Sequence, residues 1–150
     1  MHYKHILLPV DGSDTSLKAE KECIAFARSG GAKVTVLHVV SHFHLHLQSW
    51  GAFKSARTKI EREHEDEAKA IAEKMVNALV ARAREQGVEC DSLVVVGDHP
   101  YEEIIRSAEA RKCDLIMMAS HGRRGLDAVL LGSETVKVLT HTQIPVLVVR

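Results

Sequence analysis

A glycine-bearing segment in the last third of the chain has the residue types that bind phosphate. Gly122 and Gly132 carry no side chain, so a ligand could approach the backbone closely there. Ser133 is expected to open a helix, where unpaired backbone N–H groups and the helix dipole favour an anion. Arg123 and Arg124 add positive charge that suits a polyphosphate. The alternatives are an ordinary strand-to-helix connection and a Ser133 that only caps its helix.

The spacing of this segment resembles the nucleotide loop of the universal stress protein family, written G-x2-G-x9-G-[ST]. Gly122 is followed by nine residues and then by Gly132 and Ser133. Ala119 stands where the pattern has its first glycine. The resemblance extends over the whole chain, and three further segments carry it, at residues 6–13, 37–40 and 144–150.

The resemblance implies an ATP site in which Mg²⁺ or Mn²⁺ bridges the phosphates. The positions that match the family's binding residues are Pro9, Val10, Asp11, Val39, Met118, Ala119, Gly122, Arg123, Gly132, Ser133, Glu134 and Thr135. Asp11 could accept hydrogen bonds from the nucleoside or could merely shape its turn. The backbone of Val39 could read the adenine edge, or its side chain could simply pack in the core. Glu134 is expected to act through its backbone N–H, because its carboxylate repels phosphate, whereas Thr135 could add a hydroxyl or merely follow the cap.

Ala119 is the one departure from the glycines of the pattern. It ends an apolar run, so we expect an extended backbone with negative φ, which alanine adopts without strain. A methyl group beside a ribose should also cost little. The prediction is that alanine is tolerated at this position.

The segments that position these residues are short apolar runs alternating with stretches of helical period, a pattern typical of an α/β fold. Strands are expected at residues 5–10, 34–40, 90–96, 115–118 and 144–149. Helices are expected at 14–29, 53–86, 100–111 and 133–141, with a long loop at 41–51. Such alternation predicts a parallel sheet with right-handed crossovers and helices on both faces.

The resemblance implies a sheet order of 3-2-1-4-5, in a Rossmann-like fold of the adenine nucleotide alpha hydrolase type. Ligands of such sheets bind beyond the C-terminal strand ends, at the point where the strand order reverses. Strands one and four would flank that point. The ends of strands one, two and four would then meet in one crevice.

Helical periodicity also predicts which residues face the core. The expected inner positions of the first helix are Leu17, Ile24 and Ala27, with Cys23 beside them. Those of the second helix are Ile60, His64, Ala68, Ile71, Met75 and Leu79.

Length and composition narrow the class of protein. A chain of 150 residues suits one domain, which the resemblance makes a universal stress protein domain at 1–150. The formal net charge of +0 gives no electrostatic reason to expect nucleic-acid binding. The sequence has no apolar run long enough to span a membrane, and no apolar signal region follows Met1, so neither a membrane span nor export is expected. The three cysteines form no C-x-x-C pair, so we expect free buried thiols and a cytoplasmic protein.

The sequence favours a nucleotide-dependent regulator of a stress response over an efficient enzyme. It contains neither a P-loop lysine motif nor a G-x-S-x-G nucleophile elbow. His121 could act as an acid beside phosphate, although an exposed loop histidine is the more common case. Two alternatives stay open: a dimerising regulatory module that binds no nucleotide, and a slow ATPase.

Two further segments suggest interactions. The apolar strand at 144–149 would form a sheet edge, which invites pairing with another chain, and the resemblance implies a homodimer through it. His42, His44 and His46 alternate along the chain and would share one face if extended. A metal site is one interpretation of these histidines, and an irregular loop with exposed side chains is the other.

Overall fold

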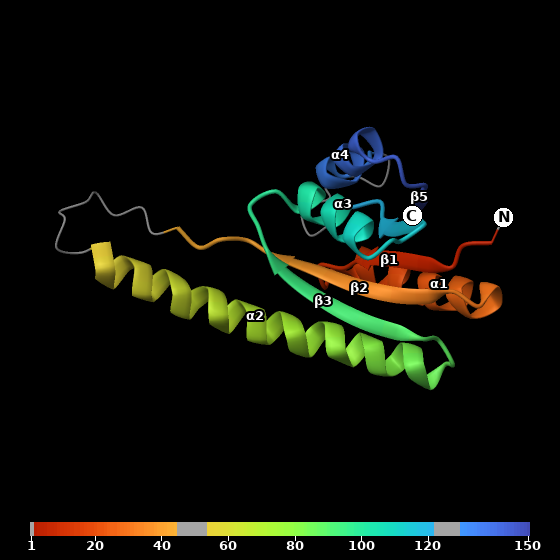
Figure 1. Ribbon diagram of the computed structural model, residues 1–150, viewed down its shortest axis with the longest axis horizontal. Helices are drawn as coiled ribbons and strands as arrows, with labels where there is room; N and C mark the ends of the chain where they lie inside the picture. Colours follow the sequence, from red (N-terminus) through yellow and green to blue (C-terminus); the bar gives the residue numbers. More distant parts are fainter. Residues whose placement is uncertain (1, 45–53, 122–129) are drawn as a thin grey trace.

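The computed structural model describes residues 2–44, 54–121 and 130–150. The strands are β1 (His5–Pro9), β2 (Lys33–Val40), β3 (Cys90–Val96), β4 (Leu115–Ala119) and β5 (Val146–Val149), and the helices are α1 (Asp14–Gly30), α2 (Lys54–Glu85), α3 (Pro100–Ala110) and α4 (Ser133–His141). The strands pair in parallel, in the order β3-β2-β1-β4-β5 (Figure 1). The predicted α/β architecture and strand order are therefore confirmed.

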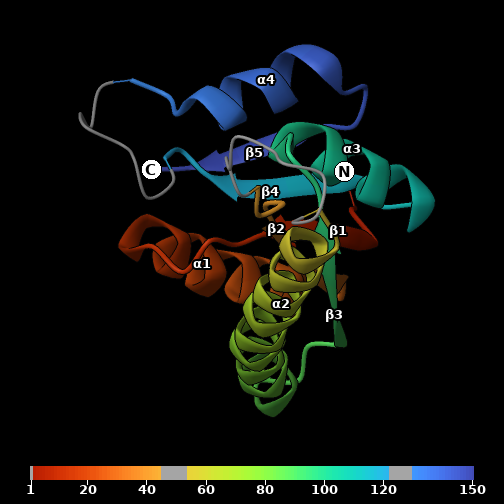
Figure 2. The ribbon, with the colours of Figure 1, turned by 90° about the vertical axis from the view of Figure 1, so that its left-hand side faces the viewer.

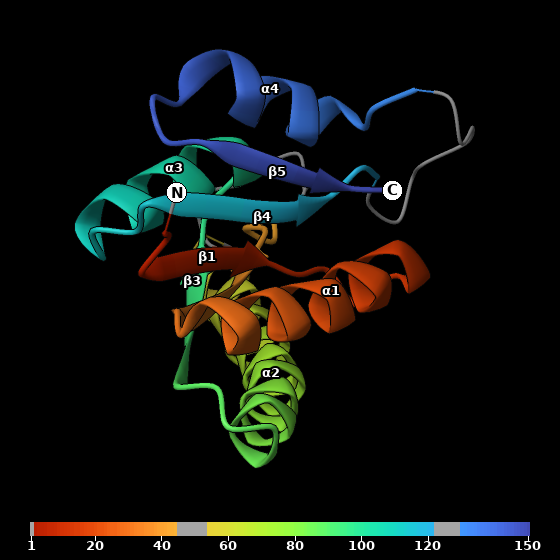
Figure 3. The same ribbon diagram turned by 90° about the vertical axis from the view of Figure 1, so that its right-hand side faces the viewer.

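Alternating side chains of the strands build one hydrophobic core on each face of the sheet. On one face, Ile6 and Leu8 of β1 pack with side chains of α1 and α2. On the other face, Leu7 of β1 and Leu37 of β2 pack with Ile104 and Ala108 of α3. Figures 2 and 3 show the two helix pairs on opposite sides of the sheet. Because both faces are covered, the central strands are almost continuously apolar.

The first helix begins and ends as its sequence predicts, and the predicted inner residues Cys23, Ile24 and Ala27 are buried. The Ser13 side chain caps it by accepting from the Ser16 N–H, and Gly31 ends it with a φ of 67°. Leu17, predicted to face the core, is exposed. Glu20 is buried instead, and its carboxylate meets Arg82 of α2 at 3.3 Å. Burial is the main reason why the pKa of Glu20 is raised above its usual range.

The inner stripe predicted for α2 is only partly correct. Met75 and Leu79 pack in the core, whereas Ile60, His64 and Ile71 are exposed. The buried positions concentrate in the C-terminal part of the helix, at Ala72, Val76, Leu79, Val80 and Ala83. Figure 1 shows the reason, because the N-terminal part of α2 projects beyond the sheet. A helical period in the sequence does not show where the sheet beneath the helix ends.

The last strand is shorter than predicted. It begins at Val146, because Pro145 has no N–H to donate and Ile144 donates to the Thr142 hydroxyl at 3.1 Å. It lies at the edge of the sheet beside β4, as expected. Among the described residues, no helix combines the length and apolar character of a membrane span.

Candidate functional site

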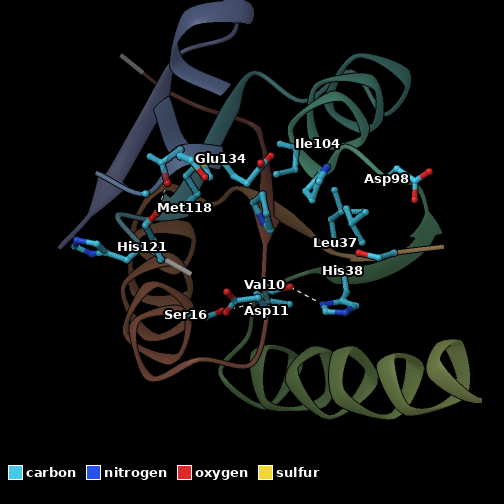
Figure 4. A pocket seen from close by; sticks show the side chains of 18 residues that line it. Val10, Asp11, Ser16, Leu37, His38, Asp98, Ile104, Met118, His121 and Glu134 are labelled. Carbon is cyan, nitrogen blue, oxygen red and sulfur yellow. Dashed lines mark hydrogen bonds between the residues drawn. The ribbon is translucent and has the colours of Figure 1, made fainter. Parts of the chain in front are cut away.

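A cavity of about 520 Å³ lies at the C-terminal ends of β1, β2 and β4 (Figure 4). Its volume is in the range of small-molecule sites. Every predicted site residue that the structure describes lines this cavity: Pro9, Val10, Asp11, Val39, Met118, Ala119, Gly132, Ser133, Glu134 and Thr135. Gly122 and Arg123, the two other predicted positions, lie outside the described residues. Chain segments that are distant in sequence thus meet where the sheet topology predicts a crevice.

The turn after β1 is shaped by the side chain of Asp11. Its Oδ1 accepts a hydrogen bond from the Ser13 N–H at 2.9 Å, and its own N–H donates to the Ser16 hydroxyl at 3.2 Å. Gly12 has a φ of 77°, a conformation that glycine adopts most readily. The turn-shaping role considered for Asp11 is therefore present. Asp11 also lines the cavity, so its part in the turn does not prevent it from contacting a ligand.

The end of β2 forms a second wall of the cavity. Val39 pairs with Val95 of β3 and lines the cavity together with Leu37 and His38. The imidazole Nδ1 of His38 lies 2.7 Å from the carbonyl oxygen of Val10, as Figure 4 shows. This hydrogen bond joins the ends of β1 and β2 at the cavity wall.

The start of α4 lines the cavity, but no serine caps this helix. Gly132 is the N-cap residue, with φ of −60° and ψ of 150°, and no side chain caps the helix. Ser133 is the first helical residue, so it does not act as the cap. The Thr135 hydroxyl is buried and donates to the carbonyl oxygen of Ala119 at 3.1 Å. Thr135 therefore ties α4 to the end of β4.

Three helices begin at this cavity. Ser16 in the first turn of α1, Pro100 at the start of α3 and Ser133 at the start of α4 all line it. The first N–H groups of a helix lack internal acceptors and carry partial positive charge. At α1 and α3 such groups already have acceptors in Ser13 and Glu134, so the start of α4, which no side chain caps, is the most favourable place for an anionic group.

Carboxylates also line the cavity, and each is paired with a donor. Asp11 accepts from the Ser13 N–H, and Asp98 lies 3.5 Å from the His44 imidazole. Glu134 accepts from the Tyr101 N–H at 2.9 Å. These pairings reduce the repulsion that bare carboxylates would exert on an anion.

A comparison with known proteins agrees with this architecture. The sequence model of the universal stress protein family matches residues 2–150. The chain belongs to the universal stress protein family. Universal stress protein MJ0531 of Methanocaldococcus jannaschii is 36% identical over 150 residues, which cover 99% of this chain and 82% of the relative. Universal stress protein MJ0577 of the same organism is 34% identical over 156 residues, covering 99% and 95%.

Solved structures of the family share the fold. The structure of MJ0577 superposes with a TM-score of 0.82 at 32% identity, covering 99% of this chain and 96% of that chain. A universal stress protein from Archaeoglobus fulgidus in complex with dAMP superposes with a TM-score of 0.64 at 22% identity, covering 100% of both chains. At that identity the second likeness concerns the fold alone.

Ala119, which replaces the first glycine of the universal stress protein pattern, has the conformation predicted for it. It is the last residue of β4 and lies in register with Val149 of β5. Lys112 is the one non-glycine residue with positive φ in the described part of the chain. The backbone at Ala119 is therefore not strained by its methyl group.

Several residues of the cavity were not singled out from the sequence: Ser16, Leu37, His38, Ser41, Asp98, Pro100 and Ile104. Some could have been found, because β3 ends at the same edge of the sheet and Asp98 and Pro100 follow it directly. Ile104 could not, since its contact depends on how α3 is rotated against the sheet. His121, considered as an acid, lines the cavity with its Nδ1 2.7 Å from the Ser120 hydroxyl.

The histidines after β2 have carboxylate partners that come from other elements. His42 Nδ1 lies 2.9 Å from Glu65 of α2, and this hydrogen bond raises the pKa of His42 above its usual value. His44 approaches Asp98, and His46 lies outside the described residues. Within the described ranges, no group of three or more His, Cys, Asp or Glu side chains is placed to hold a metal ion.

Proposed function

We propose that this universal stress protein binds ATP in the cavity at the C-terminal strand ends, with Mg²⁺ or Mn²⁺ bridging the phosphates. The observation that carries the proposal is the convergence of all the described site residues on one cavity. Membership of the family and the dAMP complex of a protein with the same fold support a nucleotide as the ligand. The N-terminus of α4, which no side chain caps, borders the same cavity and suits an anionic ligand.

The partial positive charge at the N-terminus of α4 suggests how the nucleotide is oriented in the cavity. The phosphates are assigned to Gly132 and Ser133 at the N-terminus of α4, where no side chain caps the first N–H groups of the helix. The adenosine is assigned to the opposite wall, beside Pro9, Asp11 and Val39. Mg²⁺ commonly keeps several waters and is held largely by substrate phosphates, so the site does not require a separate cluster of protein ligands.

Two measurements test the binding proposal. Mass spectrometry of the purified protein is expected to find adenine nucleotide carried through purification. Titration calorimetry with ATP and Mg²⁺ is expected to give a dissociation constant below about 100 μM, which is ~5.5 kcal/mol of binding free energy. If ATP and AMP both fail to bind at millimolar concentration, the alternative of a regulatory module without nucleotide is the better one.

We further propose that the protein acts as a nucleotide-dependent regulator of a stress response in the cytoplasm. Cys23, Cys90 and Cys113 are free and buried, which suits a reducing compartment. Burial raises the pKa of the Cys23 thiol to about 12, so this thiol stays protonated and unreactive at neutral pH. A phosphate-release assay is expected to detect at most slow ATP hydrolysis; multiple turnovers per second would favour an ATPase instead.

The open edge of β5 supports a homodimer. In the β4–β5 ladder, Pro145 and Val149 accept through their carbonyl oxygens from β4 and the residue after it. Because successive residues of a strand alternate in direction, the N–H of Val148 points away from β4. No described strand lies beyond β5, so this donor faces the edge where a second copy would pair.

Substitution of Val148 tests the dimer. Val148→Pro removes the outward donor without touching the ladder to β4, and light scattering is expected to show a shift toward monomer. Val148→Thr is the control, since it keeps the N–H and the β-branched shape. A monomeric parent at micromolar concentration would refute the assembly.

A further inference from the structure

The first turn of α3 takes its capping group from another helix. His99 is the N-cap residue of α3, but its side chain makes no capping hydrogen bond. Pro100 follows and has no N–H, so Tyr101 carries the first backbone donor of this helix. That donor meets the Oε2 of Glu134, in the first turn of α4, at 2.9 Å. One carboxylate thus joins the N-termini of two helices.

The other oxygen of Glu134 is also engaged. The Nζ of Lys137, one turn further along α4, lies 3.1 Å from Oε1. The same ammonium lies 5.4 Å from the centroid of the Tyr101 ring, and this ring packs against His141 with centroids 5.2 Å apart. The charge of Glu134 is therefore compensated by the N-terminus of α3 and by Lys137.

These contacts lie at the wall of the cavity. Pro100 and Ile104 of α3 and Ser133 of α4 all line it, and Figure 4 shows Glu134 on the side where the two helices approach each other. The separation of α3 from α4 sets the width of the cavity at this wall. The hydrogen bond from Tyr101 to Glu134 spans that separation directly.

We propose that Glu134 is a positioning residue of the nucleotide site, a role that rests on the proposed ATP binding. Its carboxylate fixes α3 against α4 and is held by Tyr101 and Lys137. A cavity that is already in its binding geometry loses less entropy when a ligand enters. Glu134 therefore strengthens the binding of an anion although it carries a negative charge itself.

If Glu134 positions the helices, its substitution should weaken ATP binding; if its carboxylate only repels phosphate, substitution should strengthen ATP binding. Glu134→Ala removes both the charge and the acceptor for the Tyr101 N–H. We expect ATP to bind about five- to tenfold more weakly to this variant, comparable to the loss of a helix cap. Glu134→Gln keeps an acceptor oxygen without the charge and is expected to stay within about threefold of the parent. Glu109→Ala, at an exposed glutamate near the end of α3, is the control for the change in net charge.

Two results would overturn the proposal. If Glu134→Ala and Glu134→Gln both bind ATP more tightly than the parent, the carboxylate acts by repulsion. If both variants and the Glu109→Ala control bind as the parent does, Glu134 has no role in the site. A parent that binds no ATP would instead refute the proposed function itself.

Hydrogen exchange in the nucleotide-free protein tests the contact independently of binding. The Tyr101 amide is expected to exchange faster in Glu134→Ala than in the parent, and to be largely protected again in Glu134→Gln. Amides of the β1 core strand are expected to exchange equally in all three proteins, which excludes a general loss of stability. Equal exchange of the Tyr101 amide in all three proteins would overturn the proposed contact.

Discussion

The N-terminal end of the sheet carries a polar network that spans three strands. The Thr35 hydroxyl donates to Asp91 at 2.6 Å, and its oxygen lies 2.8 Å from Nε2 of His5. Arg111, after α3, donates to the second oxygen of Asp91 at 3.3 Å. His5 and Thr35 are buried and satisfy each other's hydrogen-bonding groups, whereas Asp91 and Arg111 remain partly exposed to water.

The C-terminal end of the same sheet is arranged differently. There the polar groups line a cavity of about 520 Å³, and helices α1, α3 and α4 begin at its wall. Parallel strands followed by helices place helix N-termini at this end of the sheet and helix C-termini at the other. The comparison indicates that polar groups at the N-terminal end stabilise the fold, whereas those at the C-terminal end are available to a ligand. Substitutions at the two ends should therefore affect different quantities.

The largest effect is expected from Gly132→Asp at the cavity. The new carboxylate would occupy the approach to the helix N-terminus and repel phosphate, so ATP affinity should fall by about 100-fold or more. Aspartate is a favourable N-cap residue, so the variant should be at least as stable as the parent. Calorimetry and thermal unfolding measure the two quantities.

Gly132→Ala is the matched control for this prediction. The backbone at Gly132 has a φ of −60°, which alanine adopts without strain. Alanine adds a methyl group without charge, so its effect on affinity should be the smaller of the two. Normal ATP binding by Gly132→Asp would show that this loop is not the phosphate site.

Thr35→Val, at the N-terminal end of the sheet, should lower the stability of the protein and leave its ATP affinity nearly unchanged. It keeps the shape of the side chain but leaves buried His5 without its partner and removes the hydroxyl donor to the partly exposed Asp91, at a cost of about 1–3 kcal/mol in the free energy of unfolding. ATP affinity should stay within about twofold of the parent. Urea unfolding measures the loss, with Thr140→Val on the exposed face of α4 as control. If Thr35→Val is as stable as the parent, the polar network does not stabilise the fold.

Ala119→Gly is expected to change ATP affinity less than about tenfold, or ~1.4 kcal/mol. The backbone of Ala119 is extended, so glycine is not required for its conformation. Calorimetry on the variant and the parent measures the difference. A large gain in affinity on restoring glycine would mean that alanine impairs the site, and would weaken the proposed function.

The smallest effect is expected in how stability depends on pH through His5, at the N-terminal end of the sheet. Burial, aided by the charge of Lys33, lowers the pKa of His5 below its usual value of about 6.5. The unfolded chain then binds a proton more readily than the folded protein does. The contribution of His5 to stability is therefore fully present above about pH 6.5 and decreases as the pH falls from there through the lowered pKa.

Unfolding curves between about pH 5 and pH 8 test this direction. His5→Gln does not titrate, so its stability should fall less than that of the parent over the acidic part of the range. ATP affinity of this variant should match the parent at neutral pH. Identical pH dependence in both proteins would contradict the assignment to His5.

Much of this protein could be predicted from the order of its residues. Continuous apolar runs such as 5–10, separated by helical periods, determine a parallel α/β sheet because both faces of each strand must be covered. Cap residues such as Ser13 and Gly31 mark helix ends, since they act on the neighbouring backbone. The site residues were found because a family pattern links their spacing, and the strand order brings them together.

Only the tertiary structure decided which side chains meet across elements. The exposure of Ile60 depends on where the sheet ends beneath α2, and the burial of Glu20 depends on an arginine 62 residues further along the chain. Glu134 was expected to act through its backbone N–H, and only the structure shows that its carboxylate meets Tyr101 on another helix. Sequence periodicity indicates that a helix or strand has an apolar face. Which side chains contact that face depends on how the helices pack on the sheet.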